Sequence, residues 1–164
     1  MQHLRRVSLV LALIAMVALP SFAGPSINAQ DRVIQVPIEN TEMQAAIEAA
    51  RKSLPEFWAA FDARRAGEEG YSLKVAITDG KKIEHFWLNE IERKAGIVTG
   101  VINNDPNDVS TVKLGDRVEI PNDRISDWMF LRNGKIVGNA TLRVLMKFMA
   151  SEQAERYRIM LEKP

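Results

Sequence analysis

The chain contains no cysteine. This absence excludes disulfide bonds, thiol nucleophiles and thiolate metal sites. Secreted domains depend on disulfides mainly when their hydrophobic core is small. The 164 residues of this chain leave room for one domain whose core is held together by packing alone.

No apolar run is long enough for a comfortable membrane span, which needs about 20 residues. Residues 1–23 instead have the layout of a secretory signal peptide, in which two arginines precede an apolar stretch at 7–19 and a small-x-small cleavage site ends at Ala23. Ala29 offers a second cleavage point, and an uncleaved anchor is the alternative. We expect a periplasmic or secreted protein with no stable membrane insertion after signal removal.

The chain also has no large excess of charge of either sign. The whole chain has 22 basic and 21 acidic residues, and residues 1–23 carry two of the basic ones and none of the acidic ones. The mature chain therefore has 20 basic against 21 acidic residues, a net charge of −1. We expect no nucleic-acid partner, because no global positive charge supports one.

Helical spacing marks the first half of the mature chain. Residues 24–40 read as a lead-in with a β-prone stretch at 31–38. From Thr41 to about Gly67, apolar residues recur at the spacing of an amphipathic helix. Pro55 follows a second capping pattern at Ser53, so we expect either two helices or one helix kinked there.

After residue 70 the apolar period changes from 3.6 to 2, which predicts short antiparallel strands joined by Asp-Gly and Asn-Gly turns. Gly100 lies inside one strand and predicts a bulge or the close approach of another backbone. A capping pattern at Asn139 predicts a helix from Ala140, and Ser151 restarts it. The expected strands are residues 71–78, 83–91, 97–102, 117–120, 125–131 and 135–137.

This order predicts a single α+β domain over residues 41–164. We expect a curved antiparallel sheet or small open barrel of about five strands, flanked by N-terminal and C-terminal helices. No phosphate loop or dinucleotide fingerprint is present, so no cofactor is expected. The polar loop at 103–108 resembles a calcium loop, but Asp108 and Leu114 replace its required glycine and glutamate, so we expect no metal site.

Five short runs, taken in their order and spacing, resemble the bacterial domain-of-unknown-function family 2314, the YegJ-like proteins. The resemblance covers about residues 41–149. It implies an α+β domain often found on secreted bacterial proteins, and it implies no established activity or catalytic residues. The runs are EHFWL at 84–88, GVINNDP at 100–106, GD at 115–116, ISDWM at 125–129 and GNATLR at 138–143.

His85 is the one histidine left after signal removal, which makes it the obvious general base. Asp127 is the candidate acid, and Ser126 or Thr99 the candidate hydroxyl. No Gly-x-Ser-x-Gly elbow accompanies them. The alternative is a histidine that is hydrogen-bonded at the sheet surface.

Asp127 is followed by Trp128, and a regular strand directs two neighbouring side chains to opposite faces. We expect Trp128 to fill the core and Asp127 to be the exposed member of the pair. Its carboxylate would then accept hydrogen bonds from the amides around residues 139–141.

Candidate ligand-binding residues lie at the start of the last helix and on a neighbouring strand. Asn139, Thr141 and Arg143 could hold an anion at a helix N-terminus, and the alternative is an ordinary helix cap. Trp87 could rim a pocket beside them.

Three functional hypotheses follow. The first is a non-enzymatic extracytoplasmic module that binds a small ligand or an envelope protein. The second is a small hydrolase that uses His85 with Asp127 in a cleft beside Trp87. The third is a structural envelope protein with no small ligand.

Overall fold

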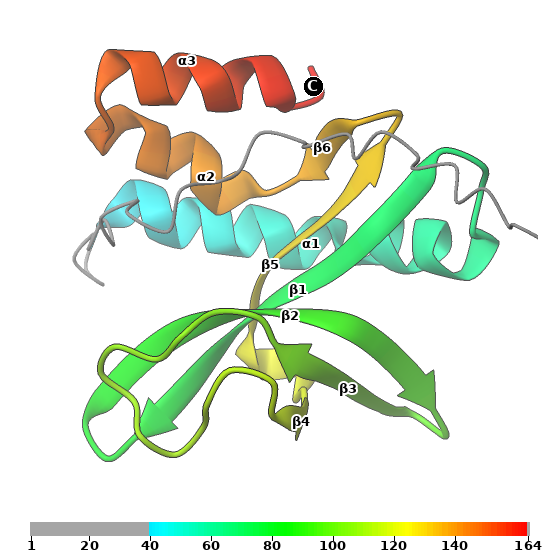
Figure 1. Ribbon diagram of the computed structural model, residues 1–164, viewed down its shortest axis with the longest axis vertical. Helices are drawn as coiled ribbons and strands as arrows, with labels where there is room; N and C mark the ends of the chain where they lie inside the picture. The colour runs from blue at the N-terminus through cyan, green and yellow to red at the C-terminus, as the bar shows by residue number, and fades with distance from the viewer. Residues whose placement is uncertain (1–39, 164) are drawn as a thin grey trace, which may run out of the picture. The chain divides into compact units, whose positions relative to one another are not determined.

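The computed structural model describes residues 40–163, so the expected signal peptide and the β-prone stretch at 31–38 lie outside the described residues. The described chain is an α+β domain with a six-stranded open antiparallel sheet, as the sequence predicted (Figure 1). Its elements are α1 (Thr41–Ala63), β1 (Glu68–Asp79), β2 (Lys82–Lys94), β3 (Ile97–Ile102), β4 (Arg117–Glu119), η1 (Asn122–Arg124), β5 (Ile125–Arg132), β6 (Lys135–Gly138), α2 (Ala140–Leu145), η2 (Met146–Phe148) and α3 (Ser151–Met160).

A single helix, α1, covers one face of the sheet and contains Pro55, so of the two expected arrangements the single helix is the one that forms. Its N-cap is Asn40, whose side-chain oxygen accepts a hydrogen bond from the Met43 amide at 2.9 Å. Ser53 does not start a second helix, because its hydroxyl donates back to the Ala49 carbonyl within the same helix. The helix ends at Ala63, earlier than expected, since Arg64 adopts a left-handed conformation.

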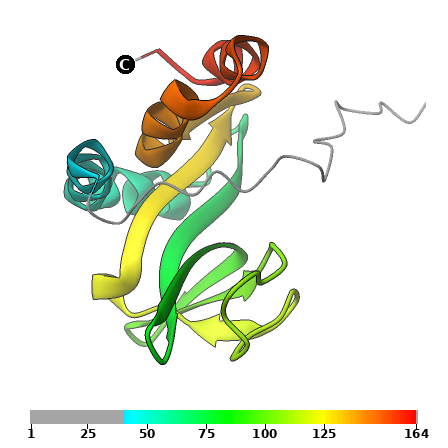
Figure 2. The same cartoon turned by 90° about the vertical axis from the view of Figure 1, so that its left-hand side faces the viewer.

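The strand order is β4-β3-β2-β1-β5-β6, and every neighbouring pair is antiparallel. Strands β1 and β5 run through the domain side by side (Figure 2). Helices α2 and α3 gather at one end of these strands, and β2, β3 and β4 curl away at the other end. The strong curvature lets one sheet enclose much of its own core.

Strands β1 and β2 pair along only part of their length. Their register runs from Asp79↔Lys82 to Leu73↔Leu88 and stops there. Beyond that point β1 pairs with β5 alone, and β2 pairs with β3 alone. Figure 1 shows the start of β1 near the end of α1 and the end of β2 beside β3, so that the two strands diverge.

The divergence coincides with the irregularity that Gly100 predicted. The register of β2 on β3 shifts between Asn89 and Glu92, which is a β-bulge. A Cβ atom on Gly100 would lie 2.8 Å from the Ile91 Cδ1 atom and 3.2 Å from the Asn89 carbonyl oxygen, so a larger residue here would force its neighbours to shift. Both expectations at Gly100, the bulge and the close approach, are confirmed.

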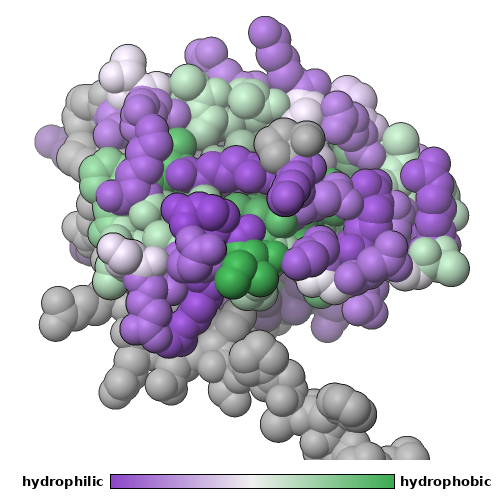
Figure 3. Space-filling model, turned by 90° about the horizontal axis from the view of Figure 1, so that it is seen from above, coloured by the Kyte–Doolittle hydropathy of each residue, from purple (hydrophilic) through white to green (hydrophobic). Residues whose placement is uncertain are grey.

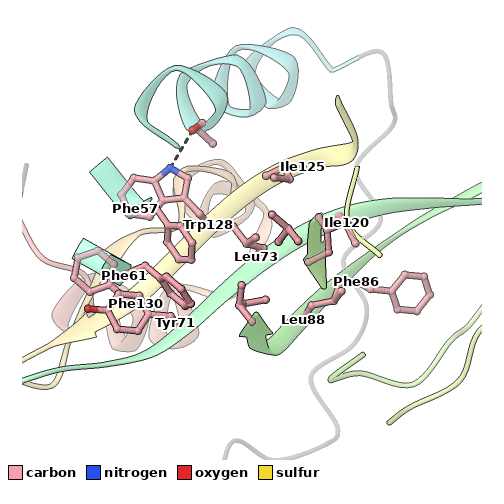
Figure 4. Close-up of a cluster of buried hydrophobic side chains, with 14 of the residues drawn as sticks. Phe57, Phe61, Tyr71, Leu73, Phe86, Leu88, Ile120, Ile125, Trp128 and Phe130 are labelled. Atoms are coloured by element: carbon pink, nitrogen blue, oxygen red, sulfur yellow. Dashed lines mark hydrogen bonds between the residues drawn. The ribbon is translucent and has the colours of Figure 1, made fainter. Parts of the chain in front are cut away.

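The core lies between α1 and the sheet (Figure 4). Phe57 and Leu73 are 0% exposed, and Trp128 is 3% exposed. The indole Nε1 of Trp128 donates a hydrogen bond to the Ala50 carbonyl of α1 at 3.0 Å. Trp128 therefore fills the core as expected, and its polar atom ties β5 to the helix.

A second, smaller apolar cluster joins the C-terminal helices to β6. Ile136, Leu142 and Leu161 form its buried centre. The restart at Ser151 is confirmed, because α2 gives way to η2 and then to α3. The chain end is held by a hydrogen bond from the Glu162 amide to the Ile136 carbonyl at 2.8 Å. In the part of the chain that the structure describes, no helix combines the length and the apolarity that a membrane crossing requires.

The replacement Trp128→Ala should lower the free energy of unfolding by about 3–5 kcal/mol, because it removes a buried aromatic side chain and leaves a cavity. Phe148→Ala is the control, since Phe148 is 52% exposed and should cost less than about 0.5 kcal/mol. Urea denaturation measures both changes. Equal stability of the Trp128 variant and the parent protein would place the ring outside the core.

Candidate functional site

A bulge in β5 builds the polar face of the sheet. Lys74 pairs with Asp127 and Val75 pairs with Ile125, which leaves Ser126 as the extra residue. Ile125 and Trp128 therefore both enter the core, while Ser126 and Asp127 join the same polar cluster on the opposite face. In a regular strand Ser126 would instead have shared the core face with Trp128.

Asp127 is 0% exposed, so the expectation that it is the exposed member of the pair is wrong. Its carboxylate accepts hydrogen bonds from the Ala140 amide at 3.1 Å, the Thr141 amide at 2.8 Å and the Thr141 hydroxyl at 2.6 Å. It also accepts a hydrogen bond from the Trp128 amide at 2.8 Å. The expectation that it binds the amides at the helix start is confirmed.

Asp127, rather than Asn139, caps helix α2. Asn139 has φ 54° and makes no capping hydrogen bond; its side-chain amide donates to the Met129 Sδ atom at 3.6 Å. Burial raises the pKa of the Asp127 carboxyl above its usual range, and hydrogen bonds from Thr141 and Trp128 and the charge of Lys74 oppose this rise. The helix start therefore already holds an anion, which is part of the chain.

The candidate anion-binding residues do not converge. Thr141 is 2% exposed and is bound to Asp127. Arg143 lies near the chain end, where its Nη2 atom donates to the Glu162 carbonyl at 3.0 Å. Asn139 is buried as well. These three residues support the fold of the C-terminal helices.

Lys74 is the cation of the polar face. Its Nζ atom lies 3.3 Å from the Thr141 hydroxyl and 5.4 Å from the centre of the Trp87 ring. Burial lowers the pKa of the Lys74 ammonium, and the Asp127 carboxylate acts in the opposite direction. Trp87 pairs with Lys74 across β1 and β2, so its half-buried ring packs against this cation.

His85 is joined to Ser126 at 2.8 Å through its Nδ1 atom, and the Ser126 hydroxyl donates to the Lys74 carbonyl at 3.2 Å. A serine hydroxyl has one proton, so both contacts are hydrogen bonds only when Nδ1 carries the proton and donates to Ser126. Burial, with the charges of Lys74 and Arg51, lowers the pKa of His85 to about 4. His85 is thus neutral near pH 7, with its lone pair on Nε2.

This arrangement gives no support to hydrolysis. Ser126 is 1% exposed, and its hydroxyl proton is directed at a carbonyl rather than at His85. Among residues 40–163 no hydrogen bond connects His85 with Asp127, whose acceptor atoms face helix α2. Thr99 lies elsewhere, next to Arg117 of β4.

The polar loop after β3 is held by the carboxylate of Glu84. The Glu84 side chain accepts hydrogen bonds from the amides of Asn107, Asp108 and Val109 at 3.0–3.2 Å. Over residues 40–163, histidines and carboxylates form no group of three or more that could hold a metal ion.

A cleft that the sequence did not predict opens where β1 and β2 diverge. Its volume is about 490 Å³, and we name it the β1–β2 cleft. Each strand has a neighbour on one side only at this point. The cleft is lined by residues of α1, β1, β2 and β4, among them Phe61, Arg64, Tyr71, Asn89, Glu90 and Arg117.

The β1–β2 cleft has one buried polar atom without a partner and one exposed cation without an ion pair within the described chain. The Oδ1 atom of Asn89 is buried and accepts no hydrogen bond. The Arg64 guanidinium lies 4.0 Å above the Phe61 ring and 5.1 Å from that of Tyr71. It forms no ion pair with any residue in 40–163.

Residues 40–161 match the family described as "Uncharacterized protein conserved in bacteria (DUF2314)". The chain belongs to the DUF2314 family. It is 34% identical to the uncharacterized protein YegJ of Escherichia coli (strain K12) over 131 residues. These residues make up 80% of this chain and 84% of YegJ.

A second relative is the putative ankyrin repeat protein NMB1133/NMB1171 of Neisseria meningitidis serogroup B (strain ATCC BAA-335 / MC58). It is 34% identical over 116 residues, which are 66% of this chain and 46% of that protein. This chain therefore spans less than half of that relative. No solved structure matches the chain.

The resemblance to the family seen in the sequence is confirmed, and the family match extends past residue 149 to residue 161.

Removal of the internal cap should destabilise the DUF2314 domain. Asp127→Ala leaves the buried Ala140 and Thr141 amides without acceptors, so we expect a loss of about 2–4 kcal/mol in urea denaturation. Asp127→Asn keeps one acceptor oxygen and should lose less. Asp123→Ala, at a carboxylate whose side chain is 81% exposed, is the control. Equal losses for Asp127→Ala and Asp123→Ala would contradict this role.

The pKa of His85 predicts how stability depends on pH. An unfolded histidine titrates near pH 6.5, so between about pH 6.5 and about pH 4 the unfolded chain binds more protons than the folded one. The contribution of His85 is complete above about pH 6.5 and is lost as the pH falls to about 4, by up to about 3 kcal/mol. Denaturation of the parent and of His85→Asn at both pH values checks this. An unchanged pH dependence in the variant would contradict it.

Proposed function

We propose that this DUF2314 protein is an extracytoplasmic binding module, which residues 1–23 direct out of the cytoplasm and which holds a small ligand in the β1–β2 cleft. Support for export comes from the arginine-led apolar run and the small-x-small site before Gly24. Support for binding comes from the geometry of the cleft.

The single observation that carries the proposal is a cleft of ligand size whose lining includes Asn89, a residue with a buried and unpaired side-chain oxygen. Its volume of about 490 Å³ lies within the range of about 300–1,000 Å³ that is typical of small-molecule sites. Buried acceptors in folded proteins almost always have a partner, and Asn89 Oδ1 has none. A ligand with an N–H or O–H group would supply that partner.

The polar cluster of β1, β2 and β5 is a weaker candidate. Its carboxylate, hydroxyls and imidazole are bound to one another and to backbone groups, so they are engaged within the fold. Their burial also gives a substrate little access to Ser126 and Asp127. The hydrolase alternative therefore stays a prediction without geometric support.

A broad protein interface has little support either. On the α3 side, apolar side chains form small areas divided by hydrophilic ones (Figure 3). The exposed large apolar residues come from five different segments of the chain. They are Ile83, Ile97, Leu114, Phe148 and Ile159.

The test is a substitution that separates stability from binding. Asn89→Leu removes the unpaired oxygen, so it should raise the free energy of unfolding by about 1 kcal/mol. The same change should abolish the amide chemical shift changes that a periplasmic small-molecule extract produces around Tyr71 and Asn89. If the extract moves no resonance of the cleft in the parent protein, the binding function is contradicted.

Export has its own measurement. N-terminal sequencing of the protein from the periplasmic fraction should begin at Gly24 or at Gln30. A cytoplasmic protein that begins at Met1 would contradict the proposed localisation.

A further inference from the structure

The unpaired cation at the β1–β2 cleft is the exposed side chain of Arg64, which follows the end of α1 with φ 45°. Its guanidinium carbon lies 4.0 Å from the centre of the Phe61 ring, a cation–π distance. The guanidinium forms no ion pair within residues 40–163, so its N–H groups are available to bind a carboxylate bidentately. The other arginine of the cleft, Arg117, is already engaged by Glu90 at 3.1 Å and Glu92 at 3.4 Å.

The cleft also contains acceptor atoms that lack hydrogen-bond donors. Asn89 Oδ1 lacks a donor. Within residues 40–163 the Glu69 carboxylate also has no hydrogen bond or ion pair, whereas the neighbouring Glu68 is bound to Arg132 at 2.9 Å. A ligand that matches the cleft therefore presents N–H donors together with one anionic group.

The diverging strands add backbone groups to this set. An antiparallel strand directs the N–H and C=O groups of alternate residues to alternate sides. Because residues 68–72 of β1 pair with β5 alone, the side of β1 that faces the cleft has no strand partner. Such an edge pairs readily with an extended peptide backbone.

Size limits the length of the ligand. A volume of about 490 Å³ equals a cube of about 8 Å edge. Two or three extended residues span at most about 7–11 Å. The cleft thus accommodates two or three residues of an extended chain.

We propose that the β1–β2 cleft binds the carboxyl-terminal end of a short extended peptide, with its carboxylate on Arg64 and its backbone N–H groups on Asn89 and the edge of β1. This inference rests on the proposed function and names the ligand class of that same site. The chemistry is shared by free di- and tripeptides and by the C-terminus of a longer chain.

The experiment titrates the purified ¹⁵N-labelled protein with trialanine and with trialanine amide, and follows the amide resonances of Gly70, Tyr71 and Asn89. Trialanine should move these resonances. The uncharged amide, or the replacement Arg64→Ala, should weaken binding by about tenfold or more. Asn89→Leu should weaken it likewise. Arg156→Ala is the matched control, because Arg156 pairs with Glu152 on α3 and does not line the cleft. This variant should bind trialanine as the parent does.

An eight-residue peptide with a free carboxylate separates the two sources. Tighter binding of this peptide identifies a chain terminus as the ligand, and tighter binding of trialanine identifies a free peptide; both results support the inference. Unmoved cleft resonances at millimolar trialanine, or equal binding by the parent and Arg64→Ala, would overturn it. If a periplasmic extract still moves the cleft resonances, only the ligand class fails; if neither probe moves them, the binding function fails as well.

Discussion

The buried carboxylate of Asp127 is the constraint on which the polar half of this domain depends. An ionised carboxylate without solvent needs hydrogen bonds to every accessible lone pair, and here the donors come from β5 itself and from the first turn of α2. The helix therefore begins where the carboxylate lies. Helices α2 and α3 are positioned by this contact together with the apolar cluster around Leu142.

The same constraint determines what the polar face can do. Asp127 occupies the helix N-terminus that would otherwise attract an external anion. Lys74 remains beside it as a counter-charge, and His85 stays neutral because burial and the neighbouring cations disfavour its protonated form. A face that satisfies its own hydrogen bonds has little left for a ligand. The unsatisfied acceptor lies instead at the β1–β2 cleft, where Asn89 Oδ1 accepts no hydrogen bond and the exposed Arg64 guanidinium forms no ion pair within the described chain.

Much of the fold was predictable from local pattern. Period-two alternation located all six strands, and the Asn-Gly and Asp-Gly turns located two hairpins, because these signals depend on nearest neighbours. The core position of Trp128 and the contact of Asp127 with the helix start were predicted for the same reason. The helix from Ala140 was also located correctly, although its cap comes from a distant strand instead of from Asn139.

The errors and omissions share a physical origin in long-range packing. Nothing local marks Ser126 as the extra residue of a bulge. Asp127 faces away from the core as expected, but it is buried because the start of α2 covers its carboxylate, which the pattern of β5 alone does not indicate. The cleft arises because, beyond the Leu73↔Leu88 pair, β1 pairs with β5 alone and β2 pairs with β3 alone. This pairing is a property of the whole sheet. Arg64 and Asn89 belong to no recognisable motif, so no sequence pattern could have joined them.

The central claim is that the Asp127 carboxylate occupies the start of α2 and excludes external anions from it. Amide hydrogen exchange at this helix start tests the claim most directly. The amides of Ala140 and Thr141 should exchange as slowly as the core of β5, and their chemical shifts should not respond to added phosphate. Exchange of these amides within minutes, or a change of their chemical shifts on addition of phosphate, would show that the helix start is open to external anions. Either result would contradict the account.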